Sequence, residues 1–153
     1  MSIPETFKKF IGNWSGANRL WLSQREAVRE SEAKARVALA ARGKFVTIQY
    51  SWADDGHPQE GLLLIGVEEH PNLVHAVWVD SWHMGDKLML CDGQVNDSGI
   101  ISVTGSYAAP SGPDWGWRIE IEAGAEDKFE LIMYNISPDG QEMLAVQASY
   151  QRE

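Results

Sequence analysis

The chain has 153 residues, 44% of them hydrophobic, and 22 acidic against 13 basic residues give it a formal net charge of −9. This length is typical of one domain, so a single domain over residues 1–153 is expected. The acidic balance disfavours nucleic acid and membrane surfaces as partners, because it repels phosphates and anionic head groups. No apolar run is long enough to span a bilayer, and residues 1–10 lack the apolar stretch of a secretory signal peptide, so a cytoplasmic protein is expected.

Residues 4–11 predict the only convincing helix. Apolar side chains recur there at spacings of three and four behind Ser2, which indicates one or two helical turns. A helix this short could serve as a lid.

Everything after Gly12 predicts β-strands. The residues run with a period of two and are interrupted by turn-forming residues, which delimit roughly ten strands. The connectors are too short for parallel crossovers, so the neighbouring strands are expected to be antiparallel and to form a meander. The predicted turns lie at residues 42–43, 54–56, 70–72, 85–86, 96–99, 109–114, 123–127 and 137–140.

Ten strands without covering helices can protect their edges by closing into a barrel or by splitting into a sandwich. Apolar and polar residues alternate along 117–122 and along 146–151, so one face of the sheet is dry and the other wet. The dry face mixes large rings with small residues such as Ala33 and Gly105. This mixture suits an incompletely filled barrel, although a sandwich could also use it, and the barrel is the preferred prediction.

The stretch Gly12-Asn13-Trp14-Ser15-Gly16 is similar to the opening of lipocalin-type barrels, in which a Trp plugs the closed end. With further motifs at 50–52, 61–66, 78–83, 105–107, 114–118 and 150–152, the chain resembles a family of small bacterial proteins of unknown function. That family is grouped with the lipocalin-like, or calycin, superfamily. The resemblance covers nearly the whole chain and implies an all-β, up-and-down antiparallel β-barrel that holds a ligand, like lipocalins and fatty-acid-binding proteins. It implies no reaction.

Near the end of the sequence, Tyr150 and Arg152 share the face of Val146 and Ala148 and are expected at or inside the barrel. The pair resembles the Arg-x-Tyr arrangement of fatty-acid-binding proteins in reversed order. There the guanidinium could take a ligand carboxylate and the phenol could add a hydrogen bond. Alternatively, Arg152 lies in solvent or pairs with a surface acid.

The segment 78–83 is the densest group of candidate residues. A strand through it places Trp78, Asp80 and Trp82 on one face and His83 on the other. Asp80 could orient a ligand or act as a general base. Alternatively, it binds backbone amides at the strand end while the indoles fill the core.

An inward Asp80 needs a partner, because an unpaired carboxylate in an apolar interior is costly. Tyr50 and Arg152 are the candidate partners.

No metal or cofactor is predicted. The four histidines do not show the spacing of a zinc site. Related haem-holding barrels use a histidine on the last strands, and residues 129–153 contain none, which disfavours haem although His83 could still be a ligand. The single cysteine, Cys91, has no activating neighbour and is interpreted as a small apolar strand residue.

The leading prediction is a non-enzymatic protein that holds a small hydrophobic or amphipathic molecule, with an anionic head group as an option. Two alternatives stay open. One is a small isomerase or lyase that uses Asp80 or His83 as base. The other is a filled barrel that serves as an interaction module or as a homodimer subunit. The residues expected to line or close the pocket are Trp14, Tyr50, Trp52, Trp78, Asp80, Trp82, Trp117, Tyr150 and Arg152.

Overall fold

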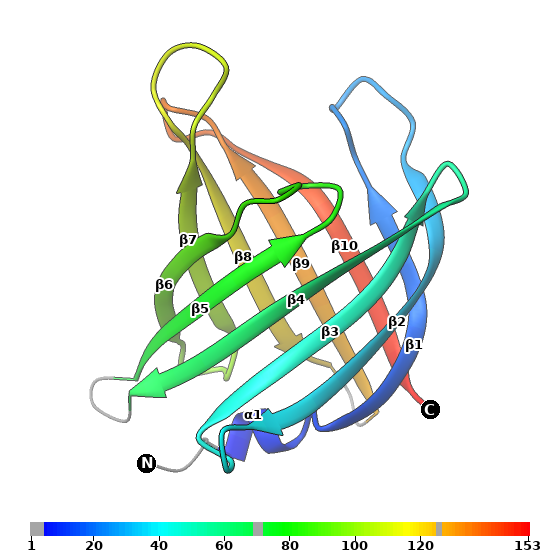
Figure 1. Ribbon diagram of the computed structural model, residues 1–153, viewed down its shortest axis with the longest axis vertical. Coiled ribbons are helices and arrows are strands. Elements are labelled where there is room, and N and C mark those ends of the chain that lie inside the picture. Colours follow the sequence, from blue (N-terminus) through cyan, green and yellow to red (C-terminus); the bar gives the residue numbers. More distant parts are fainter. Residues whose placement is uncertain (1–4, 69–71, 125–126) are drawn as a thin grey trace.

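The computed structural model describes residues 5–68, 72–124 and 127–153. These residues form one helical turn and ten strands (Figure 1). The elements are α1 (Glu5–Lys8), β1 (Gly12–Leu20), β2 (Arg29–Ala40), β3 (Phe45–Asp54), β4 (His57–Glu68), β5 (Leu73–Asp80), β6 (Met89–Val95), β7 (Ile101–Tyr107), β8 (Trp115–Ala123), β9 (Lys128–Ile136) and β10 (Glu142–Arg152).

The ten described strands form one closed antiparallel barrel. Each strand pairs with the next in sequence, and β1 pairs with β10 to close the ring, from Trp14 opposite Arg152 to Leu20 opposite Val146. The all-β barrel predicted from the alternation is therefore confirmed over the sandwich. One break was not predicted: a loop at 21–28 separates β1 from β2.

Alternation along the strands divides the inside of the barrel from the outside. In β8, Trp117, Ile119 and Ile121 are buried, and the residues between them are less so. The same period of two along every strand builds one continuous hydrophobic core inside the ring.

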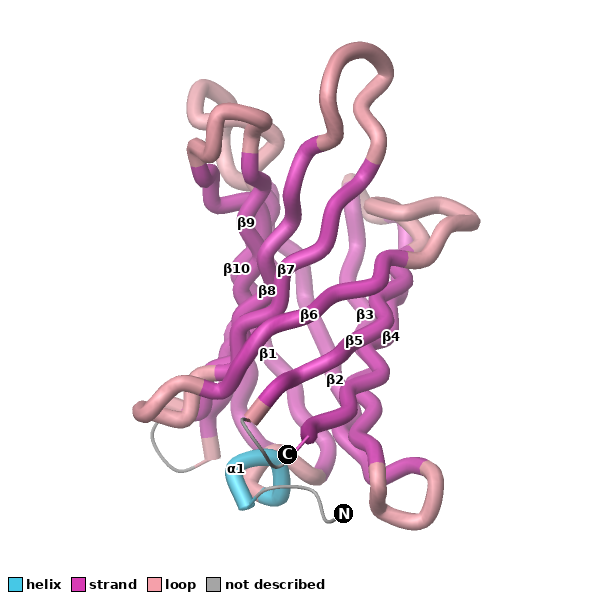
Figure 2. Tube along the Cα trace, turned by 90° about the vertical axis from the view of Figure 1, so that its left-hand side faces the viewer, coloured by secondary structure: helices cyan, strands magenta, loops and turns pink. Residues whose placement is uncertain are grey.

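The two ends of the barrel differ. Figure 2 shows α1 across one end, which we call the closed end, while the longer loops extend from the opposite end, which we call the mouth. Phe7 of α1 and Phe10 just after it are buried. No helix within the described ranges is long and apolar enough to cross a membrane.

Candidate functional site

A buried carboxylate, Asp80, lies inside the barrel where β5 ends, and only 2% of it is exposed. Its Oδ2 accepts hydrogen bonds from the Tyr50 hydroxyl at 2.7 Å and from Trp52 Nε1 at 3.3 Å. Its Oδ1 accepts from the backbone N–H groups of Trp82 and His83, both at 2.9 Å. Tyr50 is thus the partner that the sequence required of an inward Asp80. Four donors surround this carboxylate, which fits an acceptor that holds the turn in place.

Gly61 makes the link between Tyr50 and Asp80 possible. It lies on β4 between these two residues, paired with Tyr50 on one side and Asp80 on the other. A Cβ at position 61 would lie 2.2 Å from the Tyr50 hydroxyl oxygen. The missing side chain therefore leaves the space through which the Tyr50 ring reaches the carboxylate. Burial, more than the nearby Asp80, raises the pKa of Tyr50 well above its usual value, so the phenol stays a proton donor.

His83 lies inside the barrel, and the prediction that it faces away from Asp80 is wrong. The strand period ends at Asp80, because the chain turns there: the Met84 N–H donates to the Asp80 backbone oxygen at 2.9 Å, while the Asp80 side chain holds the next two amides. This turn directs the imidazole inward, where four indole rings surround it at centroid distances of 4.7–5.7 Å.

The His83 imidazole has no hydrogen-bond partner among the described residues. Burial lowers its pKa, against the opposing effect of the Asp80 carboxylate. The ring is therefore neutral at neutral pH, with one nitrogen able to donate and the other able to accept.

Between Asp80 and the closed end, side chains fill the barrel. A cavity of only about 10 Å³ borders Asp80, Tyr50, Asn18 and Tyr150. That is about the room that a single water molecule needs. The expected pocket through the middle of the barrel is therefore not present within the described residues, and Tyr50 and Tyr150 belong to the core.

An open pocket of about 450 Å³ lies at the mouth instead. Its walls come from the end of β1 and the loop after it, the β5–β6 turn, and the mouth-side ends of β8, β9 and β10. It has no lysine or arginine among its lining residues within the described chain. The lining residues are Leu20, Trp21, Leu22, Ser23, Gln24, Trp82, His83, Trp117, Asn135, Met143, Leu144 and Ala145.

Trp117 lines this pocket and carries a buried donor that has no partner in the described chain. Its ring stacks on Trp78 with centroids 5.3 Å apart, and only 6% of the residue is exposed. Trp78 Nε1 donates to the Tyr50 hydroxyl, whereas Trp117 Nε1 is the one buried side-chain nitrogen or oxygen in the described chain without a partner. Buried polar atoms are usually satisfied, so this N–H marks a place where an acceptor is missing.

At the closed end, Arg152 and Trp14 hold the chain together. Trp14 Nε1 donates to the Phe10 carbonyl at 2.8 Å, and the Arg152 guanidinium lies 4.3 Å from the Trp14 ring centroid. Arg152 donates to the carbonyls of Lys9 at 2.6 Å and Ile11 at 2.7 Å, and to Asp127 at 3.0 Å. Each guanidinium nitrogen has a protein partner. Of the two predicted roles of Arg152, the pair with a surface acid, here Asp127, is therefore the one present, rather than a guanidinium free for a ligand carboxylate beside Tyr150.

The sequence-predicted residues thus divide into three places. Two of them, Trp82 and Trp117, line the mouth pocket. The hydrogen-bond network beneath the pocket consists of Asp80, Tyr50, Trp52 and Trp78. Toward the closed end, Tyr150 packs against Phe129, and Trp14 and Arg152 lie at that end. His83, Asn135 and the loop at 21–24 were absent from the predicted lining. The inward direction of His83 could have been predicted from Asp80, because an Asp at the end of a strand commonly accepts hydrogen bonds from the backbone of the turn that follows.

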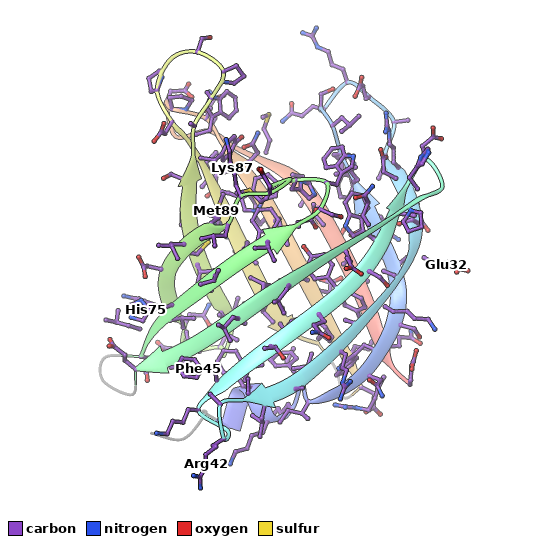
Figure 3. All side chains as sticks on the ribbon, in the orientation of Figure 1. Glu32, Arg42, Phe45, His75, Lys87 and Met89 are labelled. Carbon is purple, nitrogen blue, oxygen red and sulfur yellow. The ribbon has the colours of Figure 1, made fainter. Side chains whose placement is uncertain are left out.

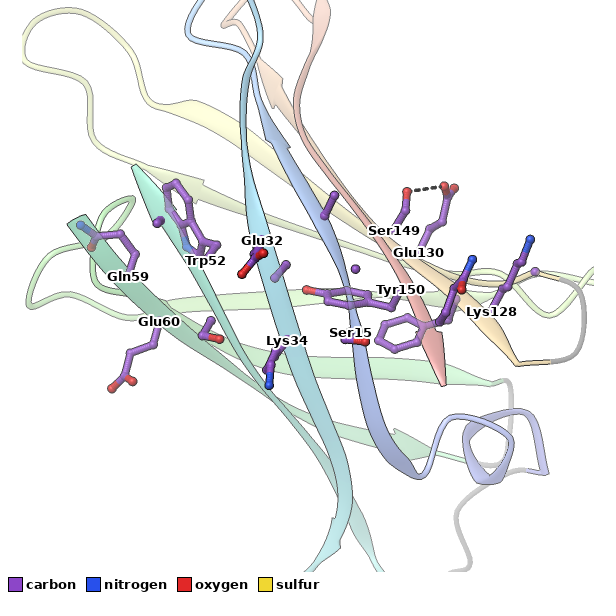
Figure 4. Close-up of a pocket in the computed structure, with 18 of the residues that line it drawn as sticks. Ser15, Glu32, Lys34, Trp52, Gln59, Glu60, Lys128, Glu130, Ser149 and Tyr150 are labelled. Atoms are coloured by element: carbon purple, nitrogen blue, oxygen red, sulfur yellow. Dashed lines mark hydrogen bonds between the residues drawn. The ribbon is translucent and has the colours of Figure 1, made fainter. Parts of the chain in front are cut away.

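A groove of about 1570 Å³ lies on the outside of the barrel, and its lining residues come from β1, β2, β3, β4, β8, β9 and β10 and the turns beside them. Figure 4 shows Glu32 and Lys34 projecting around it, and Ser149 donating to Glu130 at 2.9 Å. Small or charged side chains on an open sheet surface give little apolar enclosure, so this groove is a weaker candidate for a small-molecule site than the mouth pocket.

Neither a metal centre nor a reactive thiol stands out. No group of three or more His, Cys, Asp or Glu side chains that could hold a metal ion occurs in the described part of the chain. Cys91 is buried, and burial raises the pKa of its thiol to about 11, as suits a small apolar strand residue.

Comparisons with known proteins agree with the fold. The crystal structure of Rv2717c from M. tuberculosis is similar, with a TM-score of 0.66 and 15% identity over 99% of both chains. At that identity the likeness speaks for the barrel alone. No curated protein matches the sequence. The model of the family described as "Protein of unknown function (DUF1579)" matches residues 3–152, and the chain belongs to that family.

Proposed function

We propose that this protein binds a small, flat, largely apolar molecule in the mouth pocket and holds it through a neutral hydrogen-bond acceptor. The unsatisfied Trp117 N–H carries the proposal. This buried N–H belongs to a residue that lines a pocket of about 450 Å³ with an aromatic wall. Such pockets, with few polar groups, are typical of small-molecule sites.

The polar groups of the pocket favour an uncharged acceptor, such as a carbonyl or ring nitrogen. Trp117 offers a donor, and Asn135 accepts from the Tyr107 hydroxyl through its Oδ1, which leaves its amide N–H groups as further donors. His83 is neutral, and no lysine or arginine is among the described lining residues. An anionic head group would lack a cation here, since Arg152 lies at the other end of the barrel. The resemblance to lipocalins, which implies a barrel that holds a ligand, supports the same proposal.

The test is a fluorescence titration with prodan, a flat neutral naphthalene that bears a carbonyl. Prodan should bind with one-to-one stoichiometry and a blue-shifted emission. Trp117→Phe keeps an aromatic ring but removes the donor, and it should weaken binding about five- to tenfold, the worth of one hydrogen bond of about 1 kcal/mol. The matched control is Trp115→Phe on the same strand, whose side chain is outside the pocket lining.

Two results would contradict the proposal: no saturable binding of prodan, or equal affinity in the wild type and Trp117→Phe. Native mass spectrometry of the protein purified from its own host adds an independent check, because a retained neutral molecule should be absent from the Trp117→Phe protein.

A second candidate function is a small enzyme with His83 as general base. It is favoured by one observation: the neutral imidazole borders the pocket and has no partner among the described residues. Asp80 is less suited to this role, because four protein donors surround it. An enzyme would convert its bound ligand, and His83→Gln would abolish that turnover while leaving binding in place.

A further inference from the structure

The outer face of β3, β4, β5 and β6 carries an apolar patch, here defined as Phe45, Leu62, Leu64, Val77, Val79, Leu88 and Leu90. Leu88 and Leu90 are 59% and 69% exposed, and Phe45 and Leu64 are 40% and 37% exposed. These side chains point away from the core, because they alternate with buried residues along their strands. Figure 3 shows Phe45 and His75 toward the closed end of this face. Contiguous exposed apolar patches on soluble proteins commonly mark interaction sites.

The strand register assembles these residues into rows across the sheet. Leu64 pairs with Val77, which pairs with Leu90, and Leu62 pairs with Val79 in the next row. Toward the closed end, the neighbouring row runs from Phe45, beside Gly66, through His75 to Asp92. The rows border a groove of about 640 Å³ that also includes Lys44 and Glu68.

The opposite outer face is polar. Along β1 and β2 the outward residues are small, amide or charged. On β8, β9 and β10 outward acidic residues lie beside the outward Ile132 and Tyr134; they are Glu120, Glu122, Glu130 and Glu142. Around the apolar groove, by contrast, Lys44 and His75 accompany Glu68 and Asp92. The His75 imidazole donates to the carboxylates of Asp92 and Glu68, and these hydrogen bonds raise its pKa.

We propose that the apolar patch is the interface of a homodimer with two-fold symmetry. A two-fold axis that lies in the interface, parallel to the strands and between β4 and β5, places β3 of one copy over β6 of the other. Leu64 of each copy then lies on Val77 of the second copy, and Lys44 lies beside Asp92 of the second copy. The apolar rows meet at the centre of this interface, whereas Leu90 lies over Thr47 and Phe45 lies over Asp92 of the second copy. The patch is therefore complementary to itself in apolar surface at its centre and in charge at its edge.

A second copy fits this face better than a lipid surface does. A membrane-binding face needs basic groups around its apolar residues, whereas Glu68 and Asp92 border this one, on a chain of net charge −9. In the dimer Asp92, which already lies 2.6 Å from His75 Nδ1 of its own chain, gains Lys44 of the second copy as a further neighbour of opposite charge.

Sedimentation velocity of the wild type from micromolar to millimolar concentration, at low and high salt, tests the proposal. The wild type should dimerise, and Leu90→Glu should weaken dimerisation at least about tenfold, because it places a charge in the apolar interface. The matched control, Gln151→Glu, adds the same charge to the polar outer face and should leave the dimer unchanged.

A charge exchange tests the orientation. Lys44→Glu and Asp92→Lys should each weaken the dimer, and the double variant should regain most of the affinity, because it restores an opposite-charge pair across the axis. Circular dichroism confirms that each variant is folded.

Several outcomes overturn the proposal. They are a monomeric wild type throughout the concentration range, a dimer indifferent to Leu90→Glu, or no recovery in the double variant. Flotation of a monomeric wild type with phosphatidylcholine vesicles, lost in Leu90→Glu, would assign the patch to lipid instead.

Discussion

The two ends of the barrel interior use the same residue types differently. At the closed end, Trp14 donates its indole N–H to a carbonyl, packs against Phe129 with ring centroids 4.6 Å apart, and is covered by Arg152. At the mouth, Trp117 is equally well packed but leaves its N–H without a partner in the described chain, beside an open pocket. The closed end is thus built for stability, whereas the mouth keeps unsatisfied groups at a cost in stability, as binding sites commonly do.

The largest expected effect is at the closed end. Trp14→Ala should reduce the free energy of unfolding by about 3–5 kcal/mol, because it removes a buried indole and leaves a cavity beneath Arg152. Urea denaturation measures this loss. The milder Trp14→Phe keeps the barrel folded for titration, and its prodan affinity should equal that of the wild type. A change in affinity would mean that the two ends are not independent.

A medium effect is expected at the boundary between the two ends. Gly61→Ala places a methyl group where the Tyr50 hydroxyl lies, so it should cost about 1–3 kcal/mol through overpacking and the displaced Tyr50–Asp80 hydrogen bond. Urea denaturation again reports the cost. Gly124→Ala is the control, because a Cβ there meets its nearest atom at an ordinary 3.4 Å. Equal costs for the two substitutions would contradict the role assigned to Gly61.

The smallest effect is the pH dependence that His83 contributes. Its pKa is lowered in the fold, so below its ordinary value of 6.5 the unfolded chain takes up a proton that the folded chain does not. Stability should therefore fall as the pH drops through and below 6.5, with a slope of at most about 1.4 kcal/mol per pH unit for one proton.

Denaturation midpoints between pH 7.5 and 5 compare the wild type with His83→Gln, which should flatten the fall. His75 acts in the opposite sense, because its raised pKa gives stability at low pH that is lost as the pH rises. A His75→Gln protein should consequently keep the His83 slope. An unchanged slope in His83→Gln would show that the ring is not buried as a neutral group.

Much of the barrel follows from local rules, while the site does not. The period of two and the turn residues predicted the strands and their antiparallel order, since each strand pairs with its neighbour in sequence. The Tyr50–Asp80 pair followed from the cost of a lone buried carboxylate. The inward direction of His83 was not predicted, because β5 ends at Asp80, three residues before the end of the predicted strand.

The dense packing of side chains inside the barrel could not be predicted from the sequence either. Whether a barrel encloses a cavity depends on how side chains from ten strands pack together, and no single strand determines that. The location of the pocket at the mouth, and the unpaired Trp117 N–H in its wall, emerge from this packing. The face of Arg152 could be predicted from the strand period, but its contacts with the carbonyls of Lys9 and Ile11 could not, because the fold brings those residues to it from a distant part of the chain.

The pairing of β1 with β10 also has a kinetic consequence. During synthesis β1 leaves the ribosome before the other nine strands and its partner β10 leaves after them, so the growing barrel carries an unprotected edge until then. Contacts so distant in sequence make for slow folding. The cell must therefore keep a half-made sheet from aggregating until its final strand arrives.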